Sequence, residues 1–402
     1  MIRETGTNNE TVGTPIRRLL AVNLNYLGDA LFTTPALASL RARYPHANIE
    51  VLAGERAAAM LAGNPTVDRV IVRPRRSGSA RASAFAQTIR EGNYDAAVLF
   101  QSITSNAALS WLLRVPIRVG FSQDGCSPFL THRVAGRQDG EHVVDAYLRL
   151  AQAAPAQSDS LSISSPALSI SLSPEDHVFA EQIFSKQELM PPVVGLVIGA
   201  TRAQKRWPEE YWGRLAEKLW SVGNISCVLL GGPEELDAAQ RITSQTKNAP
   251  LVSLVGRTSE KQLAAIIGQL GLVISGDSGP LHIATAMRTP VVALFGSTDP
   301  AETGPWLGSG RDNFSSATTV LYDALHCSPC RKNPTCNGRF DCLRTLTPER
   351  VFEAAFGLLG IPMRRTALPV IPSDEPAPSP RTPASVAAFE GLLRHPFGGG
   401  AH

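Results

Sequence analysis

Apolar and polar positions alternate in two ways along this chain. Short apolar runs of strand length are separated by longer amphipathic stretches of helix length. This order is typical of a parallel sheet whose strands are joined by crossover helices. The first part of the chain is thereby predicted to form strands at 18–23, 48–52, 67–72, 95–100 and 118–120, and helices at 30–43 and 106–113.

A second series of the same kind follows a stretch rich in Ala, Gln, Ser and Pro at 151–174, where we place a domain boundary. Its predicted strands are 192–198, 226–230, 251–254, 272–275 and 291–295, and its predicted helices are 208–222, 234–246, 259–270 and 281–287. Together the two series predict an α/β protein with two Rossmann-like domains that face one cleft. Ligands of such sheets bind at the carboxyl ends of the strands.

The expected boundaries follow from these series and from the composition of the chain ends. We expect a flexible N-terminus at 1–16, domains at 17–172 and 173–365, and a disordered Pro-rich tail at 366–402. The tail contains too few large apolar residues to offset the entropy lost on ordering.

Composition excludes several classes of protein. The 402 residues are 43% hydrophobic and 18% charged, with a mean hydropathy of -0.02, which fits neither a polytopic membrane protein nor a disordered chain. A net charge of +3 gives no support for a general nucleic-acid binder. The polar start of the chain shows no secretory signal, so we expect a cytoplasmic protein.

The loop at 276–282, GDSGPLH, is the most specific candidate site. A predicted strand ends there and a helix begins near Pro280, so free N–H groups and the positive end of the helix dipole converge. Such a place suits a phosphate or pyrophosphate, and glycines at 276 and 279 let ligand oxygens approach the backbone. Taken alone, the alternative is equally good: Asp277 or Ser278 caps the helix, and His282 faces the core.

Two further loops follow strands in the same half of the chain. Residues 199–208, GATRAQKRWP, hold three cations within five positions beside Thr201, and their pairing with the Asp277 loop favours a phosphate clamp over a solvated basic loop. Glu234 follows a third strand and is a candidate for holding ribose hydroxyls, although an acid at a helix N-terminus is at least as good an interpretation.

Asp29 follows the first predicted strand of the N-terminal half. An acid at this point is a candidate general base toward a hydroxyl, but an ordinary helix cap is the better interpretation on residue type alone. The chain has no G-x-G-x-x-G, Walker A or G-x-S-x-G sequence, which disfavours dinucleotide redox chemistry, P-loop hydrolysis and nucleophile-elbow hydrolysis. The absence of D-x-D removes the usual carboxylate pair for a metal-bound nucleotide diphosphate.

Several of these motifs resemble the bacterial ADP-heptose:lipopolysaccharide heptosyltransferases of glycosyltransferase family 9. The resemblance is carried by LGDALFTTPAL (27–37), GERAAAMLAGNPTVDRVI (54–71), RVGF (118–121), GATRAQKRWPEEYW (199–212), GDSGPLHIATAMRTPVVALFGSTDP (276–300) and CSPCRKNPTCNGRFDC (327–342). It spans roughly 17–359 and implies a GT-B fold, with an acceptor-binding domain first and a nucleotide-sugar-binding domain second. It also implies inverting transfer of a heptose from an ADP-sugar, without a cofactor or a metal.

The resemblance also implies roles for individual residues. Asp29 is the expected general base and Lys205 the expected catalytic cation on the diphosphate. Donor contacts are implied for Thr201, Lys205, Glu234, Asp277, Ser278, Gly279 and His282, and acceptor contacts for Asn23, Tyr26 and Arg118. Many relatives carry a basic residue where this chain has Asn23 and a small one where it has Tyr26, and both positions are expected to face the acceptor. A lipopolysaccharide core or related glycolipid is the expected acceptor.

Four cysteines, at 327, 330, 336 and 342, leave a choice open. Their spacing suits a structural zinc or an iron–sulfur cluster only loosely, and reduced thiols in a packed loop are the alternative. We assign no metal. The basic cluster at Arg73, Arg75, Arg76 and Arg81 is a candidate for peripheral contact with anionic head groups at the inner face of the cytoplasmic membrane, and a solvated loop is its alternative.

Two other functions remain open on sequence alone. A sugar-nucleotide epimerase shares the two-domain architecture and the pyrophosphate loop, but we find no further set of acids and histidines for it. A non-catalytic sugar-nucleotide-binding protein fits if Asp29 is only a cap.

Overall fold

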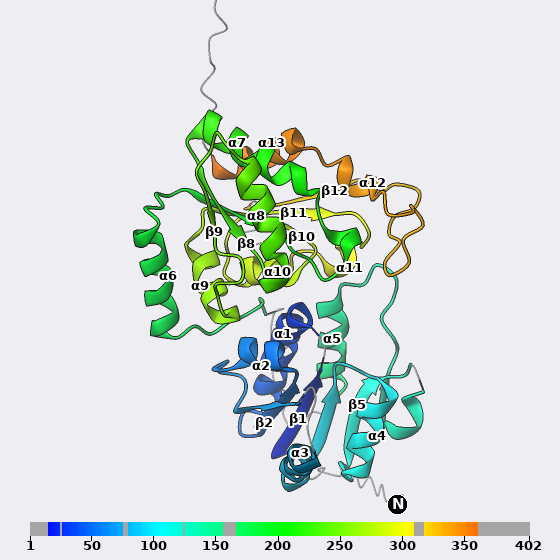
Figure 1. Cartoon of the computed structure of the whole chain (residues 1–402). Coiled ribbons are helices and arrows are strands. Elements are labelled where there is room, and N and C mark those ends of the chain that lie inside the picture. The colour runs from blue at the N-terminus through cyan, green and yellow to red at the C-terminus, as the bar shows by residue number, and fades with distance from the viewer. Residues whose placement is uncertain are drawn as a thin grey trace, which may run out of the picture. The chain divides into compact units, whose positions relative to one another are not determined.

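A computed structural model describes residues 15–24, 26–74, 79–123, 125–155, 166–308 and 317–360. Within them the chain builds two six-stranded parallel sheets with helices on both faces (Figure 1). Both sheets lie within one compact unit that ends at Met363. The expected domain boundary near residue 172 stays a prediction, and most of the expected N-terminal and C-terminal tails lies outside the described residues.

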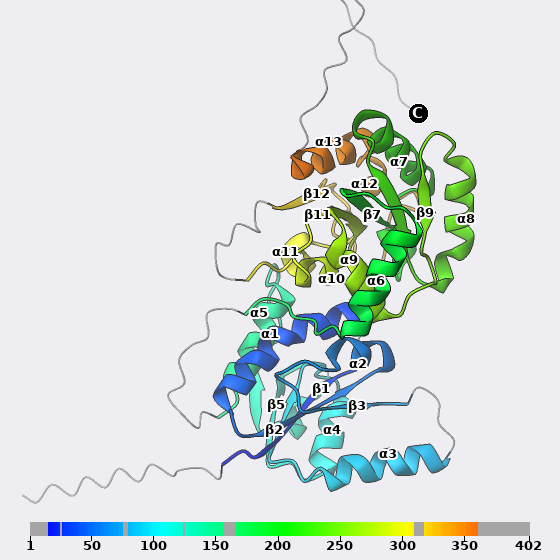
Figure 2. The ribbon, with the colours of Figure 1, turned by 90° about the vertical axis from the view of Figure 1, so that its left-hand side faces the viewer.

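The first sheet has the order β3-β2-β1-β4-β5-β6. Its strands are β1 (Arg18–Asn23), β2 (Asn48–Ala53), β3 (Arg69–Val72), β4 (Ala96–Leu99), β5 (Ile117–Phe121) and β6 (His132–Val134). The helices of this half are α1 (Leu27–Arg43), α2 (Glu55–Leu61), α3 (Ser79–Glu91), α4 (Thr104–Leu112) and α5 (Val143–Gln152), with a 3-10 turn η1 at Ser127–Phe129. Figure 2 shows α1 and α5 side by side on one face of this sheet.

Alternate residues of β1 serve different cores, which explains its continuous apolar sequence. Leu19 and Ala21 pack in the cluster that includes α1 and α5, whereas Leu20 and Val22 pack in a second cluster on the other face. A parallel strand covered by helices on both faces needs apolar side chains in both directions.

The second sheet has the order β12-β11-β10-β7-β8-β9. Its strands are β7 (Val193–Val197), β8 (Ser226–Leu230), β9 (Leu251–Ser253), β10 (Leu272–Gly276), β11 (Val291–Phe295) and β12 (Thr318–Tyr322). The helices are α6 (Pro174–Lys186), α7 (Glu209–Gly223), α8 (Leu236–Gln245), α9 (Glu260–Gln269), α10 (Gly279–Ala286), α11 (Pro300–Thr303), α12 (Asp341–Arg344) and α13 (Pro348–Leu359), with 3-10 turns η2 (Ala203–Lys205) and η3 (Pro233–Glu235).

The predicted strands are confirmed with shifts of a few residues, and the edge strands β6 and β12 are additions. β6 is only three residues long, and two of them, His132 and Arg133, are polar, so the strand leaves no alternating pattern. The predicted helix at 30–43 begins earlier, at Leu27. Helices α2, α3, α5, α6 and those after residue 295 were not predicted.

Helix α1 contains a proline in its interior and stays helical. Pro35 has no N–H to donate to the carbonyl of Leu31, four residues earlier. The hydroxyl of Thr34 donates to that same carbonyl at 2.7 Å. The side chain thus satisfies the acceptor that the proline leaves, and the helix continues over the sheet.

The arrangement places two helix beginnings where a ligand site is expected. α1 follows the carboxyl end of β1, and α10 follows the carboxyl end of β10. None of the helices in the described part of the chain is both long and apolar enough to cross a bilayer.

Trp207 offers a test of how the loop at 199–208 is fixed. Its buried indole N–H donates to the carbonyl of Leu346 at 2.7 Å. Trp207→Phe leaves that carbonyl unpaired, and we expect a loss of about 1–3 kcal/mol in the free energy of unfolding, measured by urea denaturation. Trp220→Phe, at a half-buried position of α7, is the control and should cost less. Equal losses in both variants would contradict this account.

Candidate functional site

The carboxylate of Asp277 is the centre of the candidate site. It follows β10, is buried, and accepts hydrogen bonds from Lys205 Nζ at 2.6 Å and Thr298 Oγ1 at 2.7 Å, with Thr303 Oγ1 at 3.4 Å. Burial works to raise the pKa of Asp277, but its interactions with His282 and Lys205 outweigh burial and hold this pKa well below its usual range. The carboxyl group is therefore ionised near neutral pH.

Lys205 reaches this anion because two neighbouring strands end side by side. β7 pairs with β10, so the loop after β7, which carries η2 and Lys205, lies beside the loop after β10. A Cβ at Gly276 would lie 2.7 Å from the carbonyl oxygen of Lys205. Only glycine lets the two loops approach this closely. The structure thus brings together the two loops that the sequence singled out.

The first turn of α10 lies directly after Asp277. Ser278 is the N-cap by backbone position, but its side chain makes no capping bond, and its Oγ lies 3.0 Å from Ser275 Oγ. The carboxylate of Asp277 binds Lys205 instead of capping the helix. The first N–H groups of a helix have no partner within the helix, so the turn beginning at Gly279 is suited to an anion.

His282 lies under this turn and joins the two halves of the molecule. Its ring is buried, with Nε2 3.8 Å from Asp277 Oδ1, and its Nδ1 has no hydrogen-bond partner among the described residues. The ring packs on Phe32 of α1, with centroids 4.3 Å apart. A Cβ at Gly28 would lie 3.0 Å from its Cδ2, so glycine is what allows α1 to lie this close.

Asp29 occupies the first turn of α1, three residues after the N-cap. That N-cap is Tyr26, and Asp29 accepts a hydrogen bond from its N–H. The carboxyl is partly buried, and burial raises its pKa. The charges of His282 and Lys205 act to lower this pKa and that of Asp277 to raise it, so Asp29 lies within electrostatic range of the α10 cluster. A raised pKa suits a group that must accept a proton.

Asn23 and Tyr26, two of the expected acceptor-binding residues, have surroundings that differ from each other. Asn23 is completely buried, and its amide donates to the backbone carbonyl of Asp29 at 3.0 Å, so it holds the first turn of α1 and does not reach an acceptor. Tyr26 is 68% exposed at the beginning of that helix and remains available to a ligand.

Arg118 is not brought to this cluster. It is the second residue of β5 and therefore lies toward the amino end of the sheet. Its guanidinium donates to the carbonyls of Phe129 and Val115, both at 2.5 Å. These bonds give the side chain a structural role, and we do not carry Arg118 into the proposed acceptor site.

Glu234 and its neighbour Glu235 have different partners. It is exposed and pairs with Arg56 of α2 at 3.3 Å. Glu235 instead points back toward the end of β7: it accepts from the N–H of Gly232 at 2.9 Å, and a Cβ at Gly199 would lie 2.6 Å from its carboxyl carbon. Glu235 is the better placed of the two acids beside the loop at 199–208. Thr201, in that loop, is exposed.

His142 is a residue that the sequence did not single out. It is the N-cap of α5 and its ring packs edge-on against Phe32, with centroids 5.5 Å apart. Burial lowers its pKa to about 4, so the ring is neutral near pH 7. Because Nδ1 accepts from the N–H of Val144, Nε2 carries the proton and donates to the carbonyl of Gly304. Its only sequence signal is a histidine just before an apolar helix.

The described residues contain no group of three or more His, Cys, Asp or Glu side chains placed to hold a metal ion. The four clustered cysteines are free thiols, and burial followed by the nearby Cys336 and Cys327 raises the pKa of Cys330. The basic cluster is described only at Arg73, which is exposed. Arg75, Arg76 and the side chain of Arg81 lie outside the described residues.

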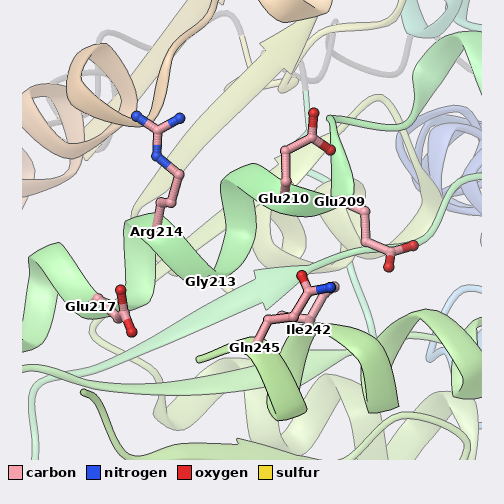
Figure 3. Close-up of a pocket in the computed structure, with 7 residues that line it drawn as sticks. All are labelled: Glu209, Glu210, Gly213, Arg214, Glu217, Ile242 and Gln245. Carbon is pink, nitrogen blue, oxygen red and sulfur yellow. The ribbon is translucent and has the colours of Figure 1, made fainter. Parts of the chain in front are cut away.

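A separate pocket between α7 and α8 is not part of this site (Figure 3). Its acids are already engaged: Glu209 binds Arg241 through two bonds of 2.7 and 2.9 Å, and Glu210 binds Arg344 at 3.2 Å. Glu217 accepts from two backbone N–H groups, those of Lys247 and Asn248.

The two acids of the site should have opposite effects on stability. The pKa of Asp29 is higher in the folded state than the unfolded value of about 3.9, so its favourable contribution is lost as the pH rises through the folded pKa. The pKa of Asp277 is lower when folded, so its contribution is present above about pH 3.9 and is lost as the pH falls through the folded pKa.

Asp29→Asn is therefore expected to raise the urea midpoint near pH 7, and Asp277→Asn to lower it. For Asp277→Asn, the loss in the free energy of unfolding should not exceed about 3–5 kcal/mol, the cost of breaking a fully buried ion pair, because Lys205 is partly exposed. Both differences should shrink toward acid pH. Shifts of the same sign in the two variants would contradict the assigned pKa directions.

The sequence of this chain is similar to those of known proteins. Residues 82–340 match the family model described as glycosyltransferase family 9 (heptosyltransferase). Lipopolysaccharide heptosyltransferase 2 of Salmonella typhimurium is 25% identical over 354 residues, which cover 85% of this chain and 98% of that protein.

Solved structures share the fold over nearly their whole length. A glycosyltransferase family 9 protein from Veillonella parvula matches with a TM-score of 0.72 and 25% identity, over 87% of this chain and 99% of its own. The E. coli ADP-heptose heptosyltransferase II matches with a TM-score of 0.68 and 23% identity, over 85% and 98%. The expected GT-B fold is confirmed. With two parallel sheets and a matched segment covering well over half of its length, this chain belongs to glycosyltransferase family 9, the heptosyltransferases.

Proposed function

We propose that this enzyme is an inverting, metal-independent glycosyltransferase that moves a heptose from an ADP-sugar to a lipopolysaccharide core or related glycolipid acceptor. The observation that carries the proposal is the placement of Asp29, an acid of raised pKa, within electrostatic range of the Lys205–Asp277 pair at the beginning of α10. One helix beginning provides a proton acceptor and the other an anion site.

The proton transfer follows from the chemistry of Asp29. In the proposed reaction its carboxylate takes the proton of the acceptor hydroxyl as the acceptor oxygen bonds to the anomeric carbon of the sugar. The bond from that carbon to the diphosphate oxygen breaks on the opposite side, so a single displacement inverts the configuration. Asn23 supports this role by holding the carbonyl of Asp29 and with it the first turn of α1.

The departing ADP needs its developing negative charge stabilised. Lys205 offers an ammonium, and the N–H groups at Ser278 and Gly279 offer a helix beginning, which are the functions that a divalent metal performs in other transferases. Asp277 keeps Lys205 in place, and Thr298 and Thr303 keep Asp277 in place. His282 lies behind the same turn, and its Nδ1, which has no partner in the described part of the chain, leaves one polar group for a ligand or water.

The substrates are proposed from the family and from the curated relative. The Salmonella protein is named as a lipopolysaccharide heptosyltransferase, which supports heptose as the sugar and lipopolysaccharide as the acceptor. Tyr26 is the proposed acceptor contact that the structure leaves exposed, with Thr201 and one of the two acids Glu234 and Glu235 on the donor side. The epimerase and the non-catalytic binding protein are outcomes of the tests below.

The central test compares Asp29→Ala and Asp29→Asn with wild type in an assay of ADP release, using ADP-heptose and heptose-deficient lipopolysaccharide. Removal of a general base is expected to lower kcat by about 10²- to 10⁴-fold while the KM for the donor changes little. Asp237→Asn, an exposed acid of α8, is the control and should retain full activity.

The pH profile and the donor sharpen that test. Wild-type kcat/KM should fall on acidification at a pH above about 3.9, because burial raises the pKa of Asp29, and this limb should be absent from the residual activity of Asp29→Asn. Activity should persist in EDTA and prefer ADP-heptose over GDP- and UDP-sugars. Equal rates for wild type and Asp29→Ala would remove Asp29 as the base, and donor consumption without acceptor would favour an epimerase.

We also propose peripheral contact with the inner face of the cytoplasmic membrane through the cluster Arg73, Arg75, Arg76 and Arg81. Arg73 is exposed, and arginines near an anionic surface attract it in a salt-dependent manner. Replacing all four with Gln should abolish pelleting with vesicles containing anionic lipid at low salt and leave pelleting with neutral vesicles unchanged. Unaltered pelleting with anionic vesicles would overturn this contact.

A further inference from the structure

Two arginines share one buried carboxylate beside the candidate donor site. Glu302 of α11 accepts from Arg137 Nη2 at 3.0 Å through one oxygen and from Arg331 Nη2 through the other. Arg137 lies in the loop between β6 and α5, and Arg331 lies in the cysteine-rich loop at 327–342. The three side chains together carry a net charge of +1.

The backbone of Arg331 is hydrogen-bonded to the loop after β7, which carries Lys205, and to the loop after β11, which carries Thr298. Its N–H donates to the carbonyl of Ser297 at 2.6 Å, one residue before Thr298. Its carbonyl accepts from the side-chain amide of Gln204 at 3.2 Å, one residue before Lys205. Arg331 is thus held next to the residues that surround Asp277.

The guanidinium groups of Arg137 and Arg331 are held in place by Glu302 but keep N–H donors that are exposed to solvent. The side chain of Arg331 is 52% exposed and that of Arg137 is 35% exposed, although both bind Glu302. A second acid, Asp139, lies 3.6 Å from Arg331 but is fully exposed, so water screens this pair. Each guanidinium has five N–H donors, and donors remain for a further anion.

Charge balance shows why a further cation matters here. Lys205 is neutralised by Asp277 at 2.6 Å, and Arg206 pairs with Glu235 at 3.4 Å. A nucleoside diphosphate brings about two to three negative charges to a place where these side chains sum to zero. The net positive charge of Arg137, Arg331 and Glu302 lies next to the Lys205–Asp277 pair. Guanidinium groups suit the paired oxygens of a phosphate.

We propose that Arg331 of the cysteine-rich loop, together with Arg137, binds the diphosphate of the donor. This inference rests on the proposed function. Glu302 is the positioning residue that holds both guanidiniums. Lys205 and Arg331 then approach the diphosphate from two different loops, and neither alone supplies the charge that the leaving group needs.

The backbone conformation of Arg331 decides which substitution tests the proposal. Arg331 has a φ of +53°, a conformation that Asn adopts more readily than most residues, so Arg331→Asn removes the guanidinium and keeps the loop. Lys332→Asn, at the exposed neighbouring position, removes the same charge and is the matched control. Arg137→Gln tests the same cluster from a different element.

The measurement is calorimetric binding of ADP and of AMP to the full-length protein. Arg331→Asn is expected to weaken ADP binding by about 10- to 100-fold and AMP binding by much less, as for the loss of a charge-assisted hydrogen bond. Arg137→Gln should shift ADP binding in the same direction, Lys332→Asn should match wild type, and Arg331→Lys should recover part of the affinity. In the transferase assay the KM for the donor should rise while that for the acceptor stays constant.

The outcomes separate this inference from the proposed function. If Arg331→Asn and Lys332→Asn bind ADP alike, or if only the acceptor KM rises, Arg331 does not bind the diphosphate and the proposed reaction still stands. If wild type binds ADP with the expected dependence on Arg331 yet transfers no sugar, the proposed function fails and the Arg331 site stands. Wild type that binds no ADP overturns both.

Discussion

A buried carboxylate that is ionised near neutral pH, that of Asp277, organises this molecule. An ion taken out of water is tolerated only where partners replace its hydration, and Asp277 has Lys205, Thr298 and Thr303 for that purpose. Each partner comes from a segment that follows a strand of the second sheet: Lys205 from the loop after β7, Thr298 from the loop after β11, and Thr303 from α11. The demands of one charge therefore fix the loops after β7, β10 and β11 relative to one another, and the anion site is a product of that fixation.

The contact between α1 and α10 has a different physical origin, namely the absence of side chains. Gly28 lies against the ring of His282, and Gly279 lies against Leu27, so each helix offers a glycine where the other offers bulk. This close contact brings Asp29 of the first half near Lys205 of the second half. Phe32, between His142 and His282, extends the same contact along α1.

The sequence predicted the strands of both sheets apart from β6 and β12, because buried parallel strands leave continuous apolar runs, but it missed helices such as α2, α3, α5 and α6. It also predicted the loops at 199–208 and 276–282, since a strand end followed by small residues and a helix beginning is a local feature. The roles of Asn23, Arg118 and Glu234 were less predictable. The burial of Asn23, the bond from Arg118 to the carbonyl of Phe129, 11 residues away, and the different partners of Glu234 and Glu235 are set by packing that no local pattern encodes.

The first turns of α1 and α10 have one more property in common, the direction of their backbone dipoles. Each helix beginning carries about half a positive charge, and in this fold both are directed at the same small region, where Leu27 meets Gly279. The carboxylates of Asp29 and Asp277 lie beside these two helix beginnings, where a negative charge is favourable. An anion between them is attracted by both helix beginnings at once, one from each half of the enzyme.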